Sequence, residues 1–264
     1  MGTGRRLANA AYVAVTLVLA AAVVAELWFF WSYLGAQRAL GADLTFFQDA
    51  ARRWIDTGEF YLERQLAGPY VVETLVDVLY PPVSLYLFVP FLVLPAVLWW
   101  AIPIALFAVC VVRLRPARWS WPLIAFGIAW PPSVSQVLYG NTNMWVAAAI
   151  AAGTCWAWPS VLVLLKPSLA PFALIGVGRR RWWIALAILG VASVPFGSLW
   201  LDYVVAIRNS SLTGVHAIGT LPLMLVPLAA WLGRRRPLGA GGLQPDASTE
   251  AVPDVDDVAV AQVE

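Results

Sequence analysis

The chain has very few of the residues that bind metals or form disulfides. It contains one histidine and two cysteines among 264 residues, and these do not fall in a zinc-binding spacing. Cys110 and Cys155 both lie in apolar runs, which favours small buried side chains over a disulfide. The sequence therefore offers no zinc constellation, and we assign no residue as a metal ligand.

Charged residues are also scarce, at 12% of the chain, and the acids are unevenly placed. Glu26 and Asp202 are the only acids outside two segments, the loop 35–80 and the tail after Leu238. The net charge of +2 combines a basic membrane part with an acidic tail, and nothing in it suggests nucleic-acid binding. The loop holds about half of the acids, namely Asp43, Asp49, Asp56, Glu59, Glu63, Glu73 and Asp77.

Hydrophobic residues make up 61% of the chain, more than a soluble domain of this size needs. Crossing a hydrocarbon layer of ~30 Å takes ~20 apolar residues, and helices satisfy their own backbone groups there. These observations predict an all-α, polytopic membrane protein. Proline breaks allow half-helices, so we expect seven to nine spanning or re-entrant segments, drawn from the runs 8–34, 82–112, 119–138, 142–177, 182–200 and 217–233.

The two ends of the chain differ in character from the middle. The run 8–34 is too long for the core of a signal peptide and ends in an aromatic cluster, so we interpret it as a retained anchor. The tail 237–264 is acidic, rich in Gly, Pro and Ala, and free of aromatic residues. It cannot bury enough apolar area to offset its ordering entropy. We therefore predict a helical membrane domain, 1–236, followed by a disordered cytoplasmic tail.

Arginine clusters beside the apolar runs predict the topology. Such clusters are typical of cytoplasmic segments, and here they are Arg5–Arg6, 179–181 and 234–236. Both termini are then cytoplasmic and the loop 35–80 is outside, in a multi-pass protein of the plasma membrane. The run 82–112 is too long for one upright helix and favours two. Two helices would place outside, against the charge rule, Arg113, Arg115 and Arg118.

The first loop contains an amphipathic helix that we expect to lie along the outer membrane surface. One side is an apolar stripe at helical spacing, made of Leu44, Phe47, Ala51 and Trp54. The other side carries charges at spacings of three and four, which suits exposed ion pairs between Asp49, Arg52, Arg53 and Asp56. Gly58 is placed to end the helix in a left-handed conformation.

Two charged residues stand apart from these paired faces. Asp43 precedes the loop helix, and its carboxylate is either an N-cap or a general base held at the membrane–water boundary. Lys166 is the only lysine of the chain and has apolar residues on both sides. A cation there either snorkels from a helix end or is kept for an anionic ligand, such as a lipid-linked phosphate. Pro167 and Pro171 predict an irregular backbone around it.

Four motifs in order over residues 40–183 resemble one family. ADLTFFQDAARRWIDTGEFY (42–61) resembles the first-loop signature of the GT87 membrane glycosyltransferases, also called the DUF2029 family, which include polyprenyl-phosphomannose-dependent mannosyltransferases. LYPPVSLYLFVPFLVLP (79–95) is similar to the family's next segment. YGNTNMWVAAAI (139–150) resembles its Gly-Gln-x-Asn turn, and LLKPSLAPFALIGVGRRRWW (164–183) resembles its Lys-Pro element.

This resemblance implies a GT-C fold and a hexosyltransferase that takes a sugar, with mannose the expected one, from a polyprenyl phosphate on the non-cytoplasmic side. It implies Asp43 as the base. A leaving lipid phosphate also needs cations to hold it, and for this we predict Lys166, together with Arg52 or Arg53. Direct displacement by the acceptor would invert the anomeric carbon. The acceptor would be a glycolipid or glycan hydroxyl. The donor lipid needs no nucleotide-binding domain, and the resemblance leaves a divalent metal open. Further substrate-binding positions are Tyr61, Tyr80, Asn141, Asn143 and His216.

The chain also departs from the family pattern. It is shorter than is usual for the family, the usual Gln of the turn is Asn141, and the connection before the Lys-Pro element is reduced to CWAWPS. His216 lies in the segment 201–217, where it is either a helper in the cavity or incidental. A non-catalytic homologue that binds lipid or serves as a partner subunit, or a small transporter, is therefore the alternative to an enzyme.

Overall fold

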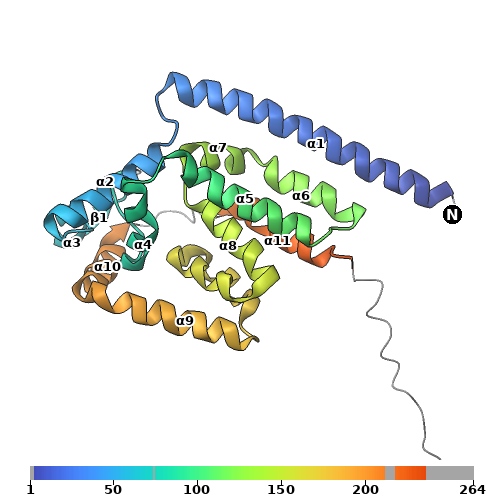
Figure 1. Ribbon diagram of the computed structural model, residues 1–264. Helices are drawn as coiled ribbons and strands as arrows, with labels where there is room; N and C mark the ends of the chain where they lie inside the picture. The colour runs from blue at the N-terminus through green and yellow to red at the C-terminus, as the bar shows by residue number, and fades with distance from the viewer. Residues whose placement is uncertain (1–2, 74, 212–217, 236–264) are drawn as a thin grey trace, which may run out of the picture. The chain divides into compact units, whose positions relative to one another are not determined.

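The described part of the chain is almost entirely helical, which confirms the predicted all-α class. The computed structural model describes residues 3–73, 75–211 and 218–235 (Figure 1). The longer α-helices are α1 (Thr3–Ala36), α2 (Ala42–Thr57), α5 (Val97–Arg113), α6 (Trp121–Ile128), α7 (Pro131–Tyr139), α8 (Asn143–Trp156), α9 (Arg180–Ser193), α10 (Gly197–Asn209) and α11 (Leu221–Leu232). The tail predicted to be disordered, 237–264, lies outside the described residues.

Shorter elements connect these helices. Two are single turns of α-helix, α3 (Glu63–Ala67) and α4 (Leu85–Phe88). Two-residue parallel strands pair β1 (Tyr70–Val71) with β2 (Ser210–Ser211). The 3₁₀ helices are η1 (Pro82–Ser84), η2 (Val89–Leu92), η3 (Arg118–Ser120), η4 (Trp158–Leu165), η5 (Pro167–Gly176), η6 (Val194–Phe196) and η7 (Ile218–Thr220).

Within the described residues, two helices are long and apolar enough to cross a membrane. They are α1 and the stretch Arg180–Asn209, and a bent pair, Pro82–Leu92 with Val97–Arg113, would make a third. The bend between the two members of that pair is 117°. The expected seven to nine segments are therefore too many. Prolines and breaks divide the other apolar runs into helices of 8 to 14 residues, about 12–21 Å long and shorter than the hydrocarbon layer.

The breaks occur where the sequence predicts half-helices. The helices α6 and α7 are separated just before Pro131, and α8 ends at Ala157, whose φ is 66°. The 3₁₀ helices η4 and η5 then form a helical hairpin with Lys166 at its tip, and the Ser160 hydroxyl donates to the Ala173 carbonyl across it (2.9 Å). The irregular backbone predicted around Pro167 is thus a tight 3₁₀ hairpin.

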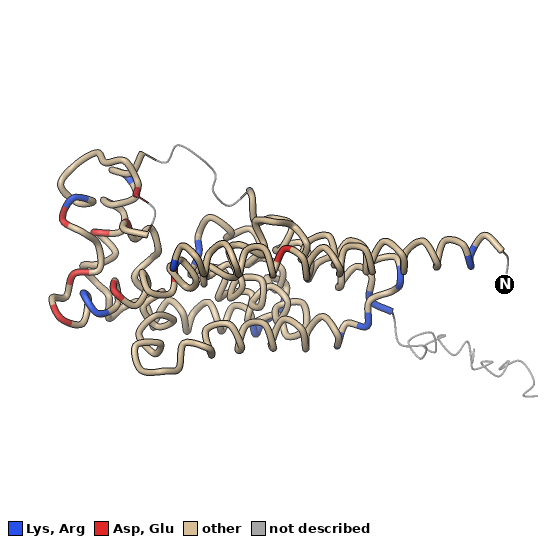
Figure 2. The backbone as a smooth tube through the Cα atoms, turned by 90° about the horizontal axis from the view of Figure 1, so that it is seen from above, with Lys and Arg blue, Asp and Glu red and all other residues tan. Residues whose placement is uncertain are grey.

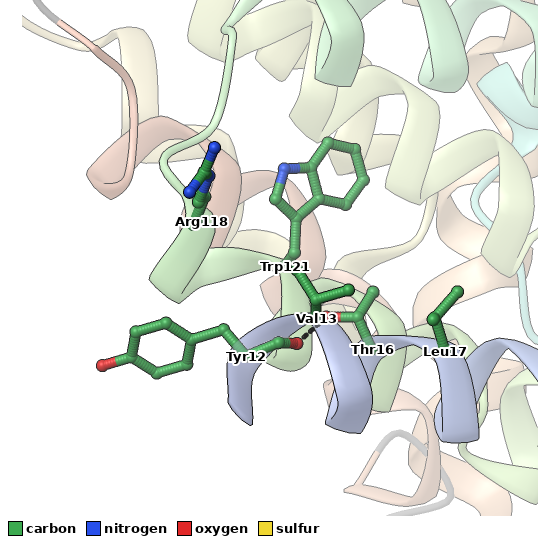
Figure 3. Close-up of a pocket in the computed structure, with 6 residues that line it drawn as sticks. All are labelled: Tyr12, Val13, Thr16, Leu17, Arg118 and Trp121. Atoms are coloured by element: carbon green, nitrogen blue, oxygen red, sulfur yellow. Dashed lines mark hydrogen bonds between the residues drawn. The ribbon is translucent and has the colours of Figure 1, made fainter. Parts of the chain in front are cut away.

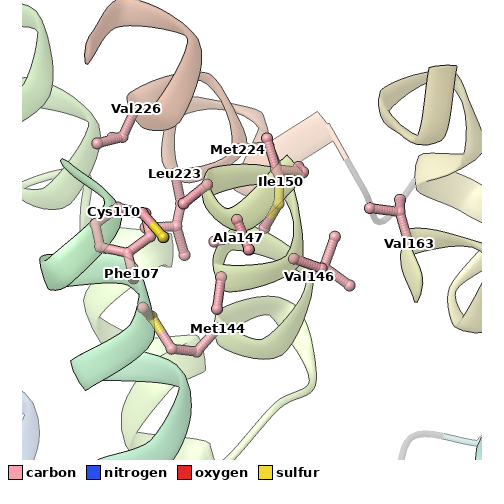
Figure 4. Close-up of a cluster of buried hydrophobic side chains, with 14 of the residues drawn as sticks. Phe107, Cys110, Met144, Val146, Ala147, Ile150, Val163, Leu223, Met224 and Val226 are labelled. Carbon is pink, nitrogen blue, oxygen red and sulfur yellow. The ribbon is translucent and has the colours of Figure 1, made fainter. Parts of the chain in front are cut away.

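One core cluster surrounds α8, whose side chains are buried on nearly every side. Figure 4 shows Ala147 and Ile150 of α8 between side chains of α5 and α11, among them Phe107 and Met224. Small residues let neighbouring backbones approach closely. A Cβ at Gly153, for example, would lie 2.7 Å from the Cβ of Ser160. Within this cluster Cys110 is buried and Cys155 partly buried, both as free thiols.

A second, aromatic cluster holds the loop helix α2. The predicted apolar stripe is confirmed: Leu44, Phe47 and Ala51 are buried, and its fourth member, Trp54, is half-buried against the same cluster. The Phe47 ring stacks on that of Phe88, with centroids 4.5 Å apart. The predicted helix end is also confirmed, since Gly58 follows Thr57 with a φ of 79°. These contacts fix the apolar side of α2 against the aromatic cluster.

The rest of the first loop is tied to α10. The Tyr70 hydroxyl donates to the Ala206 carbonyl (3.1 Å), and β1 pairs with β2. Arg64 forms ion pairs with the fully buried carboxylate of Asp77 (2.7 Å) and with exposed Glu73 (2.8 Å). The acid-rich loop is therefore an ordered layer, and Figure 2 shows it gathering the acidic residues at one end of the helices.

Apolar side chains cover much of the outer surface. Trp28 is 75% exposed, and along α1 the large apolar residues point outward over most of the helix. Exposed apolar surface on this scale indicates contact with lipid or with another protein. The structure is therefore compatible with the predicted membrane protein.

Candidate functional site

A cluster of polar residues forms where the start of α2 meets the turn between α7 and α8. Gly41, at the start of α2, has a φ of 73°, and its amide donates to the Leu138 carbonyl (3.0 Å). Gly140 ends α7 with a φ of 80°, and a Cβ there would lie 3.2 Å from the Cβ of Leu44. Glycine tolerates both the left-handed conformation and the close approach. These two glycines bring Asp43 next to Asn141.

The side chain of Asn141 bridges the two charged residues that the sequence singled out. Its amide nitrogen Nδ2 donates to Asp43 Oδ2 (2.5 Å), and its oxygen Oδ1 accepts from Lys166 Nζ (3.0 Å). The same oxygen accepts from the backbone amide of Asn143 (3.1 Å), which begins α8. Asp43 and Lys166 are thus connected through one carboxamide and form no direct ion pair in the described structure.

Neutral oxygens surround the ammonium group of Lys166. Besides Asn141 it reaches Asn143 Oδ1 at 2.6 Å and Thr142 Oγ1 at 3.5 Å. It also lies over the Tyr80 ring, 5.8 Å from the centroid. No carboxylate within 4 Å neutralises its charge in the part of the chain described. The N-terminus of the 14-residue helix α8 adds positive potential beside it.

Two tyrosines complete the cluster. The Tyr80 hydroxyl shares a hydrogen bond with the Thr142 hydroxyl (2.8 Å). The Tyr61 hydroxyl donates to the Tyr80 carbonyl (2.7 Å), so Tyr61 holds the backbone that carries the Tyr80 ring. The cluster is therefore assembled from the first loop, the turn 140–143 and the tip of the 3₁₀ hairpin.

Burial changes the pKa of the charged groups here. Asp43 is 8% exposed, and burial raises the pKa of its carboxyl, while the hydrogen bond from Asn141 and the charge of Lys166 oppose that rise. Burial lowers the pKa of Lys166 to about 8, against the attraction of Asp43. The Tyr80 hydroxyl has a raised pKa, mainly from burial. A raised carboxylate pKa favours proton acceptance near neutral pH.

Six of the predicted site residues come together in this cluster: Asp43, Tyr61, Tyr80, Asn141, Asn143 and Lys166. Arg52 and Arg53 do not. Arg52 is exposed and pairs with Asp49 at 3.6 Å, as the helical spacing predicts, while Arg53 donates to the Phe60 carbonyl (2.6 Å). His216 lies outside the described residues.

For both Asp43 and Lys166, the structure excludes one of the two roles that the sequence left open. The N-cap reading of Asp43 is wrong, because α2 begins at Ala42 with Gly41 as its N-cap and the Asp43 carboxylate turns to Asn141 instead. Snorkelling does not describe Lys166, because its ammonium group is held by polar groups inside the fold.

Some members of the cluster were not expected. Thr142 lies between the two asparagines of the YGNTNM motif and contacts both Tyr80 and Lys166. Trp99 donates from Nε1 to the Gly140 carbonyl (2.7 Å), which fixes the turn from α5. The polar spacing in YGNTNM could have indicated Thr142, whereas a tryptophan in an apolar run carries no such signal. The described residues contain no group of three or more His, Cys, Asp and Glu that could hold a metal ion.

No protein-family model, curated protein or solved structure matches the chain. The motif resemblance therefore has no independent support from these comparisons.

Proposed function

We propose that the protein is a membrane glycosyltransferase that moves a hexose from a polyprenyl phosphate to an acceptor hydroxyl. The observation that carries the proposal is the hydrogen-bonded series Asp43–Asn141–Lys166. In it, one carboxamide holds both a buried carboxylate and a cation that forms no direct ion pair within the described residues. Sugar transfer from a lipid phosphate needs both groups, one for the acceptor and one for the donor.

The reaction is a single displacement. The acceptor hydroxyl oxygen attacks the anomeric carbon while the bond from that carbon to the phosphate oxygen breaks, and the electron pair leaves with the polyprenyl phosphate. Asp43 takes the hydroxyl proton. Among the described residues its Oδ1 has no hydrogen-bonding partner, which leaves that oxygen for an acceptor. One displacement inverts the configuration at the anomeric carbon.

Lys166 and the start of α8 then act on the leaving phosphate. The Lys166 ammonium group is bound by neutral oxygens, so an arriving phosphate gains a charge partner without displacing a carboxylate. The positive end of the α8 helix dipole favours the same anion. In this proposal the six clustered residues suffice, and the exposed Arg52 and the half-buried Arg53, which have other partners, take no part.

The first test measures mannose transfer from a polyprenyl phosphate donor in membranes that contain the wild type or Asp43→Asn. Loss of a general base is expected to lower the rate at least about a hundredfold, with binding of the donor lipid retained. Asp49→Asn is the matched control, because Asp49 is an exposed acid of the same helix and should leave the rate unchanged. Equal rates in wild type and Asp43→Asn would remove Asp43 as the base.

One observation favours the alternative of a non-catalytic homologue, a lipid-binding or partner subunit. The described residues hold two candidate spans, or three with the bent pair, which is few for a GT-C enzyme that must enclose a long lipid. Donor binding that depends on Lys166, without transfer across several sugars and acceptors, would support this alternative and reject the enzyme.

A further inference from the structure

A second site lies away from the polar cluster, in an open groove between α1 and α6. Figure 3 shows its lining: one face of α1 with Tyr12, Val13, Thr16 and Leu17, opposite Arg118 and Trp121 of the segment that starts α6. The lining is almost entirely apolar, and Arg118 is the one charged residue among the six that line it. The Thr16 hydroxyl donates to the Tyr12 carbonyl (2.6 Å), so its hydrogen bond is already made without a ligand.

Arg118 is exposed, and its guanidinium group has no hydrogen bond, ion pair or ring contact within the described residues. Other arginines share this end of the fold. The Ala117 amide donates to the Gly233 carbonyl (2.7 Å), which places Arg234 beside the turn that carries Arg118. Arg113 closes α5 nearby, over the Trp156 ring at 5.4 Å. The groove therefore opens at a basic end of the molecule.

The described acids lie elsewhere. Most are in the loop at the other end of the helices, Asp202 is in α10, and Glu26 is nine residues beyond Leu17 on α1, about 13 Å along the helix. The described charged residues near the groove mouth are arginines, so the ligand that complements them is an anion with an apolar body. Trp121 and Tyr12 have the amphipathic rings found at the level of lipid headgroups.

We propose that this groove binds one anionic phospholipid, with its phosphate on Arg118 and the first part of an acyl chain along α1. A guanidinium group can donate two parallel hydrogen bonds to a phosphate. The phosphate of a zwitterionic lipid is accompanied by a positively charged group, which would weaken its attraction to the arginine. The chain segment 13–17 is about 6–8 Å long, so only the upper part of the acyl chain is held. The site does not depend on the proposed glycosyltransferase activity.

The test is native mass spectrometry of the full chain in detergent, titrated with dioleoyl phosphatidylglycerol or dioleoyl phosphatidylcholine. The wild type is expected to bind the first anionic lipid about tenfold more tightly, as one charge-assisted hydrogen-bonding pair would give. Arg118→Gln should lose that preference, and Arg118→Lys should keep part of it. Arg208→Gln is the matched control, since Arg208 is an exposed arginine at the end of α10, on the side of the acidic loop.

A second pair of variants tests the groove itself. Thr16→Phe fills the groove and should weaken the binding of both lipids, whereas Val15→Phe, on an exposed position that does not line it, should not. Glycerol phosphate, which is the headgroup without the chains, should not compete at equal concentration. Equal lipid preference in wild type and Arg118→Gln would overturn the proposal. Unchanged lipid binding in Thr16→Phe would also overturn it, and would favour a helix of a partner protein as the occupant of the groove.

Discussion

At the scale of single residues, the bridging position of Asn141 decides how Asp43 and Lys166 affect each other. A direct ion pair would hold the carboxylate in its charged form and lower its basicity. The carboxamide keeps the two charges apart while it hydrogen-bonds to both. Burial can then raise the pKa of Asp43 and lower that of Lys166 at the same time.

The sole lysine makes its protonation directly measurable. With a pKa of about 8 instead of 10.5, Lys166 should react half-maximally with an amine reagent near pH 8. Asp43→Asn should lower that midpoint further, because the Asp43 charge favours the ammonium form. The same reasoning makes the free energy of unfolding rise with pH between about 8 and 10.5, since the unfolded chain then holds more protons.

The reaction is followed by mass spectrometry on the peptide that contains Lys166, across a pH range that includes both values. Denatured protein is the control and should titrate as an ordinary lysine. A midpoint near 10.5 in the folded protein would contradict the buried, polar-bound ammonium group described above.

Two asparagine variants distinguish the effect of Asn141 on Asp43 from the effect of the asparagines on Lys166. Asn141→Ala removes the hydrogen bond that lowers the pKa of Asp43, so the acidic limb of the transfer-rate profile should move to higher pH. Asn143→Ala also removes an acceptor from Lys166 but leaves the Asp43 bond, so its acidic limb should stay in place. Profiles that move equally in both variants would show that Asn141 has no specific effect on the carboxyl.

At the scale of elements, Gly140 determines whether α2 and the turn before α8 can approach. Gly140→Ala forces a left-handed alanine and places its Cβ 3.2–3.3 Å from Leu44 and Trp100. Gly58 has nearly the same φ, 79°, but open space around it. We expect Gly58→Ala to cost about 1 kcal/mol of stability from the backbone alone, and Gly140→Ala roughly 1–3 kcal/mol more from the contact.

Thermal unfolding of the purified variants measures this difference, and the Lys166 titration reports whether the cluster has opened. Equal losses in the two variants would mean that the contact at Gly140 relaxes without strain.

The sequence predicts local features of these elements well and their lengths poorly. The α2 stripe and its end at Gly58 follow from spacing and from one glycine, and both are confirmed. The meeting of Asp43 with Asn141 does not follow, because it depends on tryptophans of α5 that hold the turn across 37 to 41 residues of sequence. Apolar composition also fails to reveal that most runs bend or end after three or four turns, so it overestimates the number of spans.

At the scale of the whole molecule, α5 runs from the polar cluster to the end of the fold that carries Arg113, Arg118 and Arg234. Trp99 and Trp100, in its first turn, contact the turn before α8, and Arg113 closes its last turn. Seventeen residues make α5 about 25 Å long, close to the thickness of a hydrocarbon layer. The polar cluster and the arginines would then lie near opposite surfaces of the membrane.

This arrangement resolves the conflict that the sequence posed for Arg113, Arg115 and Arg118. The piece 82–92 before the 117° bend is only about 16 Å long if fully α-helical, too short to cross, so the run 82–113 can count as one span. The run then ends at the same face as Arg234, to which Pro116 is bridged. All of these arginines can be cytoplasmic, in agreement with the charge rule.

Single cysteines test this topology in spheroplasts, in a background where Cys110 and Cys155 are replaced by alanine. Glu59→Cys should react with a membrane-impermeant maleimide added outside, because the predicted topology has the acidic loop on that side. Arg115→Cys should react only after the membrane is opened, since Arg115 is exposed but belongs to the basic face. Reaction of both from the same side would mean that α5 does not cross the membrane, and the polar cluster could then not face a non-cytoplasmic acceptor.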